Sequence, residues 1–322
     1  MLQKSKTSLA LAILAATGSV LGQSATQLWN FTSYIDIENS ILRSNGHLLF
    51  TTLTNPQLYT IDPSAAEPKA EVVAWLPGGV TALTGIAEVA DDKFAVTGGI
   101  RGSYNYTEET IFTVDFSVAT EENPNATVVS TVAKLPDAVM LNGMAALPSN
   151  PSILVLADSR VGCLWRVDIE TGSVAKAIES SYMLPFANST QPIGIDGLKI
   201  SADSSYAYFT NVVLSNLARV PIADNGTALV ATGDVEIITD FDGDDDWDDF
   251  ALNGTIAYGA QDPSLFSKVD LETGEYTLIA NITDAVGPTS VVLKGDGVHA
   301  YLTTRGDQTS GTSGQVFEVT YA

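Results

Sequence analysis

Aspartate is concentrated in one short stretch of this chain. Seven of the ten residues from Asp240 to Asp249 are aspartates, and the run leads directly into the apolar, strand-like segment 250–252. Because an unpaired carboxylate is costly to bury, most of the run must stay in water. One or two carboxylates at the loop-to-strand junction can still point inward and hold a hard cation such as Ca²⁺, which prefers oxygen ligands. The run also resembles an EF-hand loop, but its glycine is misplaced and Ala251 stands at the twelfth position.

The same loop-to-strand junction recurs six times along the chain. Each unit consists of an apolar strand, a short turn rich in Gly, Asn, Asp or Ser, a second strand, and a third strand that often ends in Asp. The units begin roughly 40 to 58 residues apart, which is typical of propeller blades made of three or four antiparallel strands. The first strands begin at Glu38, Thr84, Asn142, Asp196, Asp249 and Thr289.

The last unit has only three strands before the sequence stops at residue 322, and the segment 28–35 alternates in a way that can supply a fourth. We therefore predict an all-β, six-bladed β-propeller, whose ring is closed by an N-terminal strand that completes the last blade. A large sandwich or two β domains is the alternative. We expect residues 23–322 to form a single propeller domain.

Residues 1–22 have the features of a secretory signal peptide: a basic start, an apolar run and a small residue at the cleavage point after Gly22, with Ala25 as a second choice. Removing two lysines would change the net charge from −23 to −25. Such a charge disfavours nucleic acid and anionic membranes as partners. No later segment has the ~20 apolar residues of a membrane span. We expect a protein that is secreted or stays within the secretory pathway.

Glycosylation and cysteine content bear on the same question. Cys163 is the single cysteine, so no disulfide forms within the chain, and stability must come from a large apolar core. Beside a signal peptide, several Asn-X-Ser/Thr sequons predict a glycoprotein. The seven sequons are at Asn30, Asn105, Asn125, Asn188, Asn225, Asn253 and Asn281.

The sequence lacks the residues or motifs that several common catalytic mechanisms require. Two histidines are too few for a zinc triad, and no histidine-based hydrolase triad is indicated. The sequence contains no G-x-S-x-G, no P-loop and no dinucleotide fingerprint, so we expect no nucleotide, flavin or haem. Carboxylates, amides, hydroxyls, a bound ion or the shape of a pocket remain as the means of catalysis.

In a propeller, the starts of the inner strands face one another across the central channel. Oxygen-bearing side chains at these starts suit a divalent cation such as Ca²⁺. The alternative is that Asp and Asn occupy these places simply as turn-forming residues. The predicted metal ligands are Glu38, Asn142, Asp196 and Asp249.

The sequence around these positions resembles the senescence-marker-protein/gluconolactonase/luciferin-regenerating-enzyme family of six-bladed propellers. The phrases that carry the resemblance are Glu-Asn-Ser-Ile, Leu-Asn-Gly-Met, Gly-Ile-Asp-Gly-Leu and Asp-Asp-Phe-Ala. The resemblance covers the chain from residue 23 onward. It implies a divalent cation, often calcium, held by Glu in the first blade and by Asn, Asn and Asp in the third, fourth and fifth. Asp196 departs from this pattern because the family has Asn there.

A second departure concerns the substrate. Where sugar-lactone enzymes of the family have an arginine two residues before the third-blade asparagine, this chain has Met140. Met140, Met144 and Phe250 would make an apolar, adaptable wall, so we expect small-molecule apolar substrates as partners, bulky natural products instead of polar sugar lactones. The sequence does not specify an oligomeric state.

Further phrases, such as Tyr-Phe-Thr-Asn and Gly-Pro-Thr-Ser, resemble a secreted fungal subgroup of this family. That subgroup includes hetero-Diels–Alderases that join a tropolone-derived o-quinone methide to a humulene-type sesquiterpene in secondary-metabolite biosynthesis. Such a pericyclase needs positioning and hydrogen-bond donors instead of a nucleophile. Candidate donors, chosen by repeat position, are Tyr258, Asn211 and Arg305.

Two other functions are compatible with the sequence. A metal-dependent lactonase or esterase would use the ion to polarise a carbonyl, with Asp196 or Asp249 as base. A propeller that binds a ligand without catalysis would need only the pocket. The absence of an obvious nucleophile favours the pericyclase, and the clustered oxygen ligands favour the hydrolase.

Overall fold

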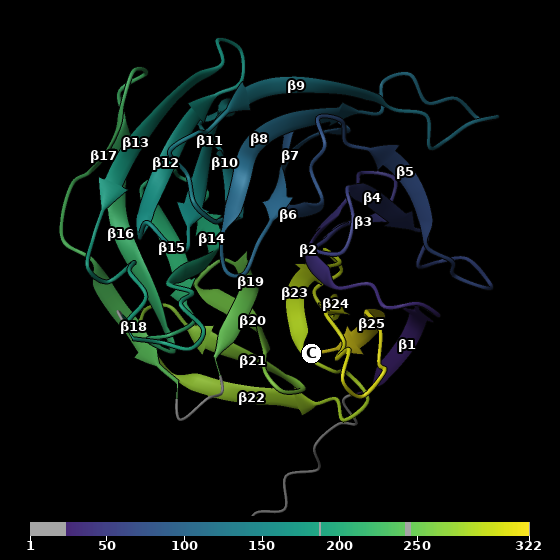
Figure 1. The fold of residues 1–322 in the computed structure, drawn as a ribbon. Coiled ribbons are helices and arrows are strands. Elements are labelled where there is room, and N and C mark those ends of the chain that lie inside the picture. The colour runs from purple at the N-terminus through teal and green to yellow at the C-terminus, as the bar shows by residue number, and fades with distance from the viewer. Residues whose placement is uncertain (1–23, 187, 242–245, 322) are drawn as a thin grey trace, which may run out of the picture.

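The computed structural model describes residues 24–186, 188–241 and 246–321. Its described residues form strands and no helix, and the strands make six sheets arranged around a central axis (Figure 1). The predicted six-bladed β-propeller is thus confirmed. No described helix is long and apolar enough to cross a membrane. The predicted signal peptide lies outside the described residues.

The first three blades each contain four antiparallel strands in sequence order. Blade one consists of β2 (Ile37–Leu42), β3 (Leu48–Thr52), β4 (Gln57–Ile61) and β5 (Glu71–Trp75). Blade two consists of β6 (Ala82–Ala90), β7 (Lys93–Arg101), β8 (Tyr106–Asp115) and β9 (Val128–Lys134). Blade three consists of β10 (Leu141–Leu147), β11 (Asn150–Asp158), β12 (Cys163–Asp168) and β13 (Ser173–Glu179).

The other blades keep the pattern with two variations. Blade four has five strands, because its fourth and fifth strands both pair with its third strand. Its strands are β14 (Ile195–Ile200), β15 (Tyr206–Asn211), β16 (Asn216–Asp224), β17 (Leu229–Ala231) and β18 (Glu236–Asp240). Blade five consists of β19 (Trp247–Asn253), β20 (Ile256–Gln261), β21 (Leu265–Asp270) and β22 (Tyr276–Asn281). Blade six consists of β23 (Pro288–Leu293), β24 (His299–Thr304), β25 (Gln315–Thr320) and β1 (Ala25–Asn30).

The ring is closed by β1, which pairs antiparallel with β25, Ala25 lying opposite Val319 and Asn30 opposite Gln315. The predicted closing strand is therefore confirmed, although it begins three residues earlier than the segment 28–35. Pairing the two ends of the sequence in one blade covers an edge that would otherwise be exposed. It also ties the first and last blades together, so the six inner strands hold fixed positions around the axis.

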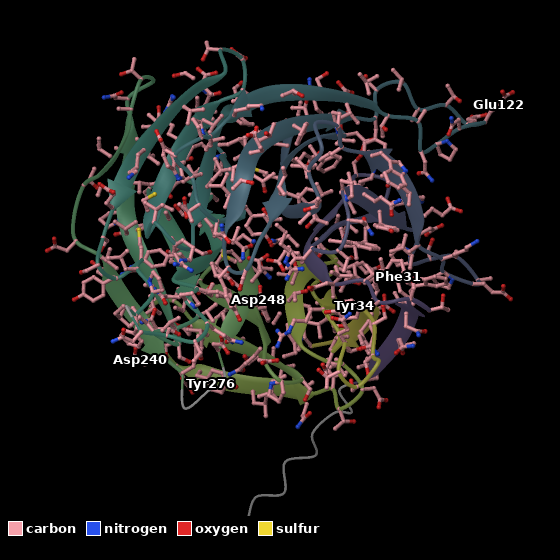
Figure 2. The ribbon with its side chains drawn as sticks, in the orientation of Figure 1. Phe31, Tyr34, Glu122, Asp240, Asp248 and Tyr276 are labelled. Carbon is pink, nitrogen blue, oxygen red and sulfur yellow. The ribbon has the colours of Figure 1, made fainter. Side chains whose placement is uncertain are left out.

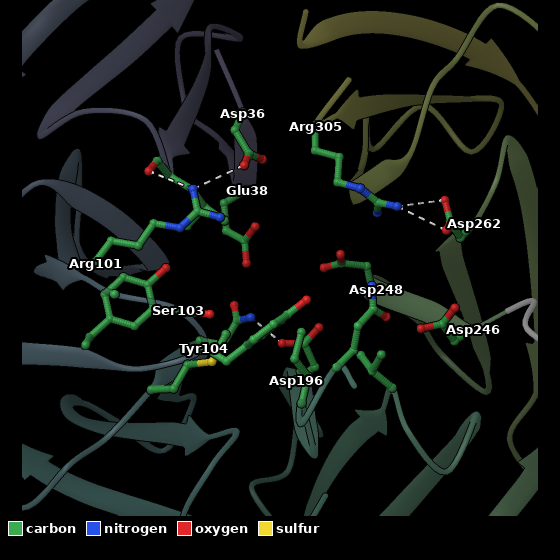
Figure 3. Close-up of a pocket in the computed structure, with 18 of the residues that line it drawn as sticks. Asp36, Glu38, Arg101, Ser103, Tyr104, Asp196, Asp246, Asp248, Asp262 and Arg305 are labelled. Atoms are coloured by element: carbon green, nitrogen blue, oxygen red, sulfur yellow. Dashed lines mark hydrogen bonds and ion pairs between the residues drawn. The ribbon is translucent and has the colours of Figure 1, made fainter. Parts of the chain in front are cut away.

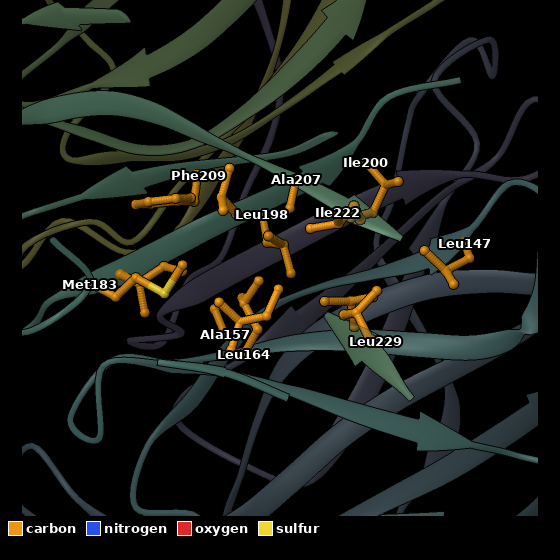
Figure 4. Packing of buried hydrophobic residues seen from close by; sticks show 14 of the residues in the cluster. Leu147, Ala157, Leu164, Met183, Leu198, Ile200, Ala207, Phe209, Ile222 and Leu229 are labelled. Carbon is orange, nitrogen blue, oxygen red and sulfur yellow. The ribbon is translucent and has the colours of Figure 1, made fainter. Parts of the chain in front are cut away.

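Apolar clusters between neighbouring blades hold the ring together. Between blades three and four, Leu164 and Ala157 pack against Leu198 and Phe209, all fully buried (Figure 4). Burying one such large aliphatic or aromatic side chain contributes about 1.5–3 kcal/mol. Because each strand alternates its side chains between faces, every blade presents apolar side chains to both neighbours. The packing fixes where each inner strand starts.

Every inner strand carries a pairing irregularity at its start, of the kind produced by a β-bulge. Two residues of the inner strand in blades one to five, and Thr289 alone in blade six, are left out of the regular register, and their side chains can turn toward the axis. The residues just before these irregularities are Ile37, Leu83, Leu141, Ile195, Trp247 and Pro288. The first residues of the irregularities are Glu38, Thr84, Asn142, Asp196, Asp248 and Thr289.

Glycine follows the first bulge residue in blades two to four because the next blade passes very close. A Cβ atom at Gly143 would lie 2.3 Å from the Asp196 carbonyl oxygen, and one at Gly197 would lie 2.7 Å from the Asp248 carbonyl oxygen. Threonines of the second strands add hydrogen bonds: Thr210 Oγ1 donates to the Asp248 carbonyl at 2.8 Å. These contacts lock each bulge to its neighbour and so set the geometry of the axis.

Candidate functional site

A cavity of about 360 Å³ opens at the end of the axis where the inner strands begin (Figure 3). Residues from all six blades line it, at or before the bulges of the inner strands and around the hairpins that follow the second strands. Its lining combines carboxyl and guanidinium groups with apolar side chains. The apolar ones are Leu53, Met140, Ile193 and Val212.

Three of the four predicted metal ligands meet in this cavity. Glu38, Asn142 and Asp196 line it, and each is buried. The Asn142 side chain joins two blades, since its Nδ2 donates to Asp196 Oδ1 and its Oδ1 accepts from Asn39 Nδ2 at 3.3 Å. The structure therefore brings these residues together as the sequence predicted, and their binding of an ion stays a prediction.

In the fifth blade the prediction of Asp249 was wrong by one residue, because Asp248 is the residue that lines the cavity. Trp247 takes the place that Ile37, Leu141 and Ile195 take in other blades, so the first bulge residue is Asp248. Asp249 points elsewhere and is paired with Lys199, whose Nζ lies 2.6 and 2.8 Å from the two carboxylate oxygens.

Burial of the cavity's carboxyl groups favours their neutral forms. The pKa of Glu38 is raised to about 7 by burial and then by the nearby charge of Asp36. Burial likewise raises the pKa of Asp196 and of Asp248 well above the ordinary value, and the negative charges of neighbouring carboxylates add to the effect. These shifts favour the protonated carboxyls, which can donate hydrogen bonds.

The donor types of Glu38, Asn142, Asp196 and Asp248 suit a hard cation such as Ca²⁺. Their spacing is less suitable. Among the described residues, no three acidic, histidine or cysteine side chains come together closely enough to hold a metal ion. The Asn142 amide oxygen is also engaged with Asn39. In this structure the residues do not fit a metal centre.

Two arginines face the cavity, Arg101 from the end of β7 and Arg305 from the loop after β24. Arg101 Nη1 donates to the Leu53 carbonyl at 3.0 Å and lies 3.3 Å from Asp36 Oδ2. Arg305 Nη2 lies 3.1 and 3.0 Å from the two oxygens of Asp262. Each guanidinium has five N–H groups, and in the described part of the chain the hydrogen bonds above use one nitrogen of each. Other N–H groups of both arginines can therefore bind a ligand in the cavity.

The prediction of Arg305 as a cavity donor agrees with its position, and its catalytic role stays a prediction. The other two donors predicted from repeat position were misplaced. Tyr258 lies in the apolar cluster between blades five and six, with its ring 4.9 Å from that of Tyr321. Asn211 is buried outside the cavity lining, where its Nδ2 donates to the carbonyls of Tyr182 and Leu184. Both side chains support the fold.

Of the predicted apolar wall, only Met140 lines the cavity. Met144 is buried between blades two and three, and Phe250 is buried between blades four and five. The reason is strand alternation beyond the bulge, which turns these two side chains into the interblade cores. The wall is completed instead by Leu53, Ile193 and Val212, which come from loops.

The acidic run is divided between two environments. Figure 2 shows Asp240 near the outer part of the ring and Asp248 close to its centre. Residues 242–245 lie outside the described residues. The expectation that the run before the blade is solvated holds for the exposed Asp240 but not for Asp246, which lines the cavity.

The sequons lie on the surface with one exception. Asn125 is half-buried and donates a hydrogen bond to Glu71 at 3.2 Å. Glycosylation of all seven stays a prediction. The exposed ones are Asn30, Asn105, Asn188, Asn225, Asn253 and Asn281.

Sequence reasoning missed the residues that reach the cavity from loops. Asp36 precedes the first bulge, Asp262 lies in a hairpin, and Arg101 and Tyr104 lie in the hairpin between β7 and β8. The one available signal was the unusual phrase Gly-Gly-Ile-Arg-Gly-Ser-Tyr, which breaks the repeat. Repeat position alone does not reveal such residues, because loops differ from blade to blade.

No protein-family model matches the chain. In sequence it is 28% identical over 256 residues to "Putative hetero-Diels-Alderase asR5" of Sarocladium schorii, a match that covers 72% of this chain and 62% of that protein. It is also 28% identical over 240 residues to a "Putative hetero-Diels-Alderase" of Phoma sp, covering 67% of this chain and 66% of that protein. The predicted resemblance to proteins of that name is confirmed. The matches span two thirds or less of these relatives' own lengths.

Solved structures support the same fold. A luciferin-regenerating enzyme superposes with a TM-score of 0.66 at 14% identity, covering 93% of this chain and 95% of its own. Regucalcin of Agrobacterium tumefaciens, a calcium-binding protein, superposes with a TM-score of 0.63 at 17% identity, covering 92% and 93%. At such identities the likeness concerns the fold alone, and it agrees with the six-bladed propeller predicted from sequence.

Proposed function

We propose that this protein is a hetero-Diels–Alderase that joins an o-quinone methide, derived from a tropolone or polyketide, to a humulene-type sesquiterpene. The proposal rests on one observation, the presence of two guanidinium groups and a set of apolar side chains around the same cavity. The similarity to proteins named hetero-Diels–Alderases supports it. An electron-poor heterodiene requires donors at its oxygen, whereas an apolar alkene requires a surface free of them.

The addition forms two bonds at once. The oxygen and the terminal carbon of the heterodiene each bond to one alkene carbon, no atom leaves, and neither an oxidant nor a nucleophilic side chain takes part. Negative charge grows on the heterodiene oxygen as the alkene donates electrons. Donors from Arg101 and Arg305 would stabilise that charge, and they are held in place by Asp36 and Asp262 before the substrate arrives.

Positioning supplies the rest of the rate enhancement. Holding two reactants in the reacting orientation can lower the activation barrier by about 7–11 kcal/mol, because their translational and rotational freedom is lost on binding instead of in the reaction step. The cavity of about 360 Å³ lies near the small end of ordinary ligand pockets, which measure about 300–1,000 Å³. We expect the heterodiene to lie inside and part of the larger alkene to extend through the open mouth along Ile193 and Val212.

The test is a cycloaddition with the purified protein. An o-quinone methide is generated in solution from a hydroxymethyl tropolone in the presence of humulene, and the adducts are separated by chiral chromatography. We expect a faster reaction and one dominant stereoisomer. Since a hydrogen bond to a charged group contributes about 1.5–3 kcal/mol, Arg101→Met and Arg305→Met should each lower the rate about 10- to 150-fold.

Arg219→Met is the matched control, because Arg219 pairs with Glu236 on the outer part of blade four and does not line the cavity. It should leave the rate unchanged. A rate and an isomer mixture equal to those of the reaction without protein would refute the proposal for this pair of substrates.

A metal-dependent lactone or ester hydrolase is the second candidate. It is favoured by the oxygen-bearing side chains of Glu38, Asn142, Asp196 and Asp248 around one cavity, although their spacing does not form a metal site here. Hydrolysis of lactones that persists in excess chelator would exclude this candidate, and hydrolysis that calcium restores would support it over the cycloaddition.

We also propose that the protein enters the secretory pathway. The exposed positions of six sequons are compatible with glycosylation at each of them. Protein isolated from its natural source should then lose apparent mass on enzymatic removal of N-glycans. An unchanged mass would contradict the proposal.

A further inference from the structure

The hairpin between β7 and β8 is tied to the blades on both of its sides. On one side, Arg101 Nη1 donates to the Leu53 carbonyl of blade one at 3.0 Å. On the other, Arg160 Nη1 of blade three donates to the Tyr104 carbonyl at 3.1 Å. β7 and β8 stay paired up to Arg101 and Tyr106, beyond the ends of β6 and β9, so the hairpin reaches over the cavity that its residues help to line. The tip is thus held in a defined place.

The backbone at that tip is unfavourable for the residue it carries. Tyr104 has a φ angle of +52°, in the left-handed region that favours glycine. A residue with a side chain pays roughly 1–2 kcal/mol to adopt this conformation. Gly102, two residues earlier in the same hairpin, has no positive φ. The turn itself therefore gives no reason for a tyrosine at position 104.

The side chain has a clear location. Tyr104 is half-buried and lines the cavity, and Figure 3 shows it reaching across the cavity toward Asp196 and Asp248. Met140 and Ile193 line the same cavity and form part of its apolar wall. The flat aromatic ring of Tyr104 therefore lies near the carboxyl groups of Asp196 and Asp248, where a planar, conjugated ligand can stack on it.

We propose that the Tyr104 ring is the surface on which the planar heterodiene stacks, and that Tyr104 thereby determines which face of the heterodiene is open to the alkene. This inference rests on the proposed function. Aromatic rings prefer offset or edge-on arrangements at centroid separations of about 4.5–7 Å, which orient a planar partner as well as bind it. A ring that covers one face leaves a single face for bond formation, so the stereochemistry of the adduct depends on this residue.

Two substitutions distinguish the contribution of the Tyr104 ring from those of its backbone strain and its hydroxyl group. Tyr104→Gly removes the ring and relieves the backbone strain, whereas Tyr104→Phe keeps the ring and removes the hydroxyl. With tropolone as the probe in calorimetric titrations, we expect Tyr104→Gly to weaken binding at least tenfold and Tyr104→Phe to stay within threefold of wild type. The melting temperature of Tyr104→Gly should equal or exceed that of wild type.

Ser204→Gly is the matched control for backbone strain. Ser204 has a φ angle of +60° in the hairpin between β14 and β15 and does not line the cavity. It should leave tropolone binding unaltered. Because Ser204 Oγ accepts a hydrogen bond from the Ser149 N–H at 3.0 Å, the melting temperature of Ser204→Gly reports the loss of that bond as well as the relief of strain. In the cycloaddition, only Tyr104→Gly should shift the isomer ratio toward that of the uncatalysed reaction.

Several outcomes overturn the inference. The inference fails if Tyr104→Gly binds tropolone as tightly as wild type, if it loses binding together with several degrees of melting temperature, or if Tyr104→Phe loses as much binding as Tyr104→Gly. Wild-type protein that does not bind tropolone also overturns it. If tropolone binding depends on the ring but wild type forms no adduct, the proposed function fails and stacking at Tyr104 stands. If wild type forms the adduct and Tyr104→Gly keeps its stereoselectivity, the proposed function stands and the role of Tyr104 is refuted.

Discussion

Asp248 and Asp249 are neighbours in sequence but occupy opposite environments, so isosteric Asn substitutions at the two positions should behave in opposite ways. Asp249 is almost fully buried and paired with Lys199, whose side chain is 29% exposed. Asp248 faces the cavity among other carboxyls. We predict that Asp249→Asn destabilises the fold and that Asp248→Asn stabilises it above pH 5 in buffer containing a chelator.

The magnitude for Asp249→Asn follows from the ion pair. Removing one partner of a buried pair costs about 3–5 kcal/mol, and the partial exposure of Lys199 lowers this to about 2 kcal/mol because water can solvate the ammonium. Taking an unfolding entropy of about 2.1 cal/mol/K per residue and about 300 residues, this corresponds to a decrease of about 3 °C in melting temperature.

The sign for Asp248→Asn follows from its pKa. Burial raises the pKa of Asp248 above the value of 3.8 in the unfolded chain, so the folded state disfavours the carboxylate. The wild type then loses stability as the pH rises from about 4 through the folded-state pKa, and it regains none above it. Asparagine carries no charge, so the stability advantage of the variant should grow between pH 5 and pH 8.

Thermal unfolding of both variants and wild type at pH 5 and pH 8 measures these differences. Binding of tropolone by Asp249→Asn should stay near that of wild type, because Asp249 does not line the cavity. If Asp249→Asn were as stable as wild type and Asp248→Asn were the destabilised variant at both pH values, the register assigned to the blade-five bulge would be refuted.

Two other substitutions test the surroundings of the cavity. Burial raises the pKa of Glu109 to about 8, so the stability of wild type should fall as the pH rises from about 4.5 to about 8. Glu109→Gln should flatten this pH dependence of the unfolding free energy in urea titrations. Parallel pH profiles of the two proteins would contradict the prediction. A Cβ atom at Gly287 would lie 2.9 Å from the Arg305 guanidinium carbon, so Gly287→Ala should displace that group. The cycloaddition rate should then fall toward that of Arg305→Met, and an unchanged rate would show that the position of Arg305 is unimportant.

The fold could be read from the sequence because each blade repeats a local pattern. Alternating strands, short turns and recurring junctions specify a propeller without any knowledge of distant contacts. The segment that closes the ring was also visible, since the last unit lacked a strand. For the same reason, the residues at equivalent junctions, Glu38, Asn142 and Asp196, could be expected to meet near the axis.

The details of the site depended on contacts that no single blade specifies. Asp248 takes the axial place of blade five because Trp247 packs in the interblade core and fixes the bulge one residue earlier than expected. Strand alternation then directs Phe250 into that core.

The sequence by itself determined the number of blades, their order and the kind of side chain at most junctions, because these follow from local strand periodicity and turns. Only the tertiary structure decided which carboxylate faces the cavity and which loops supply Arg101 and Tyr104. Those outcomes depend on how six separate segments pack around one axis, and a shift of one residue in a strand turns a side chain from the cavity into the core.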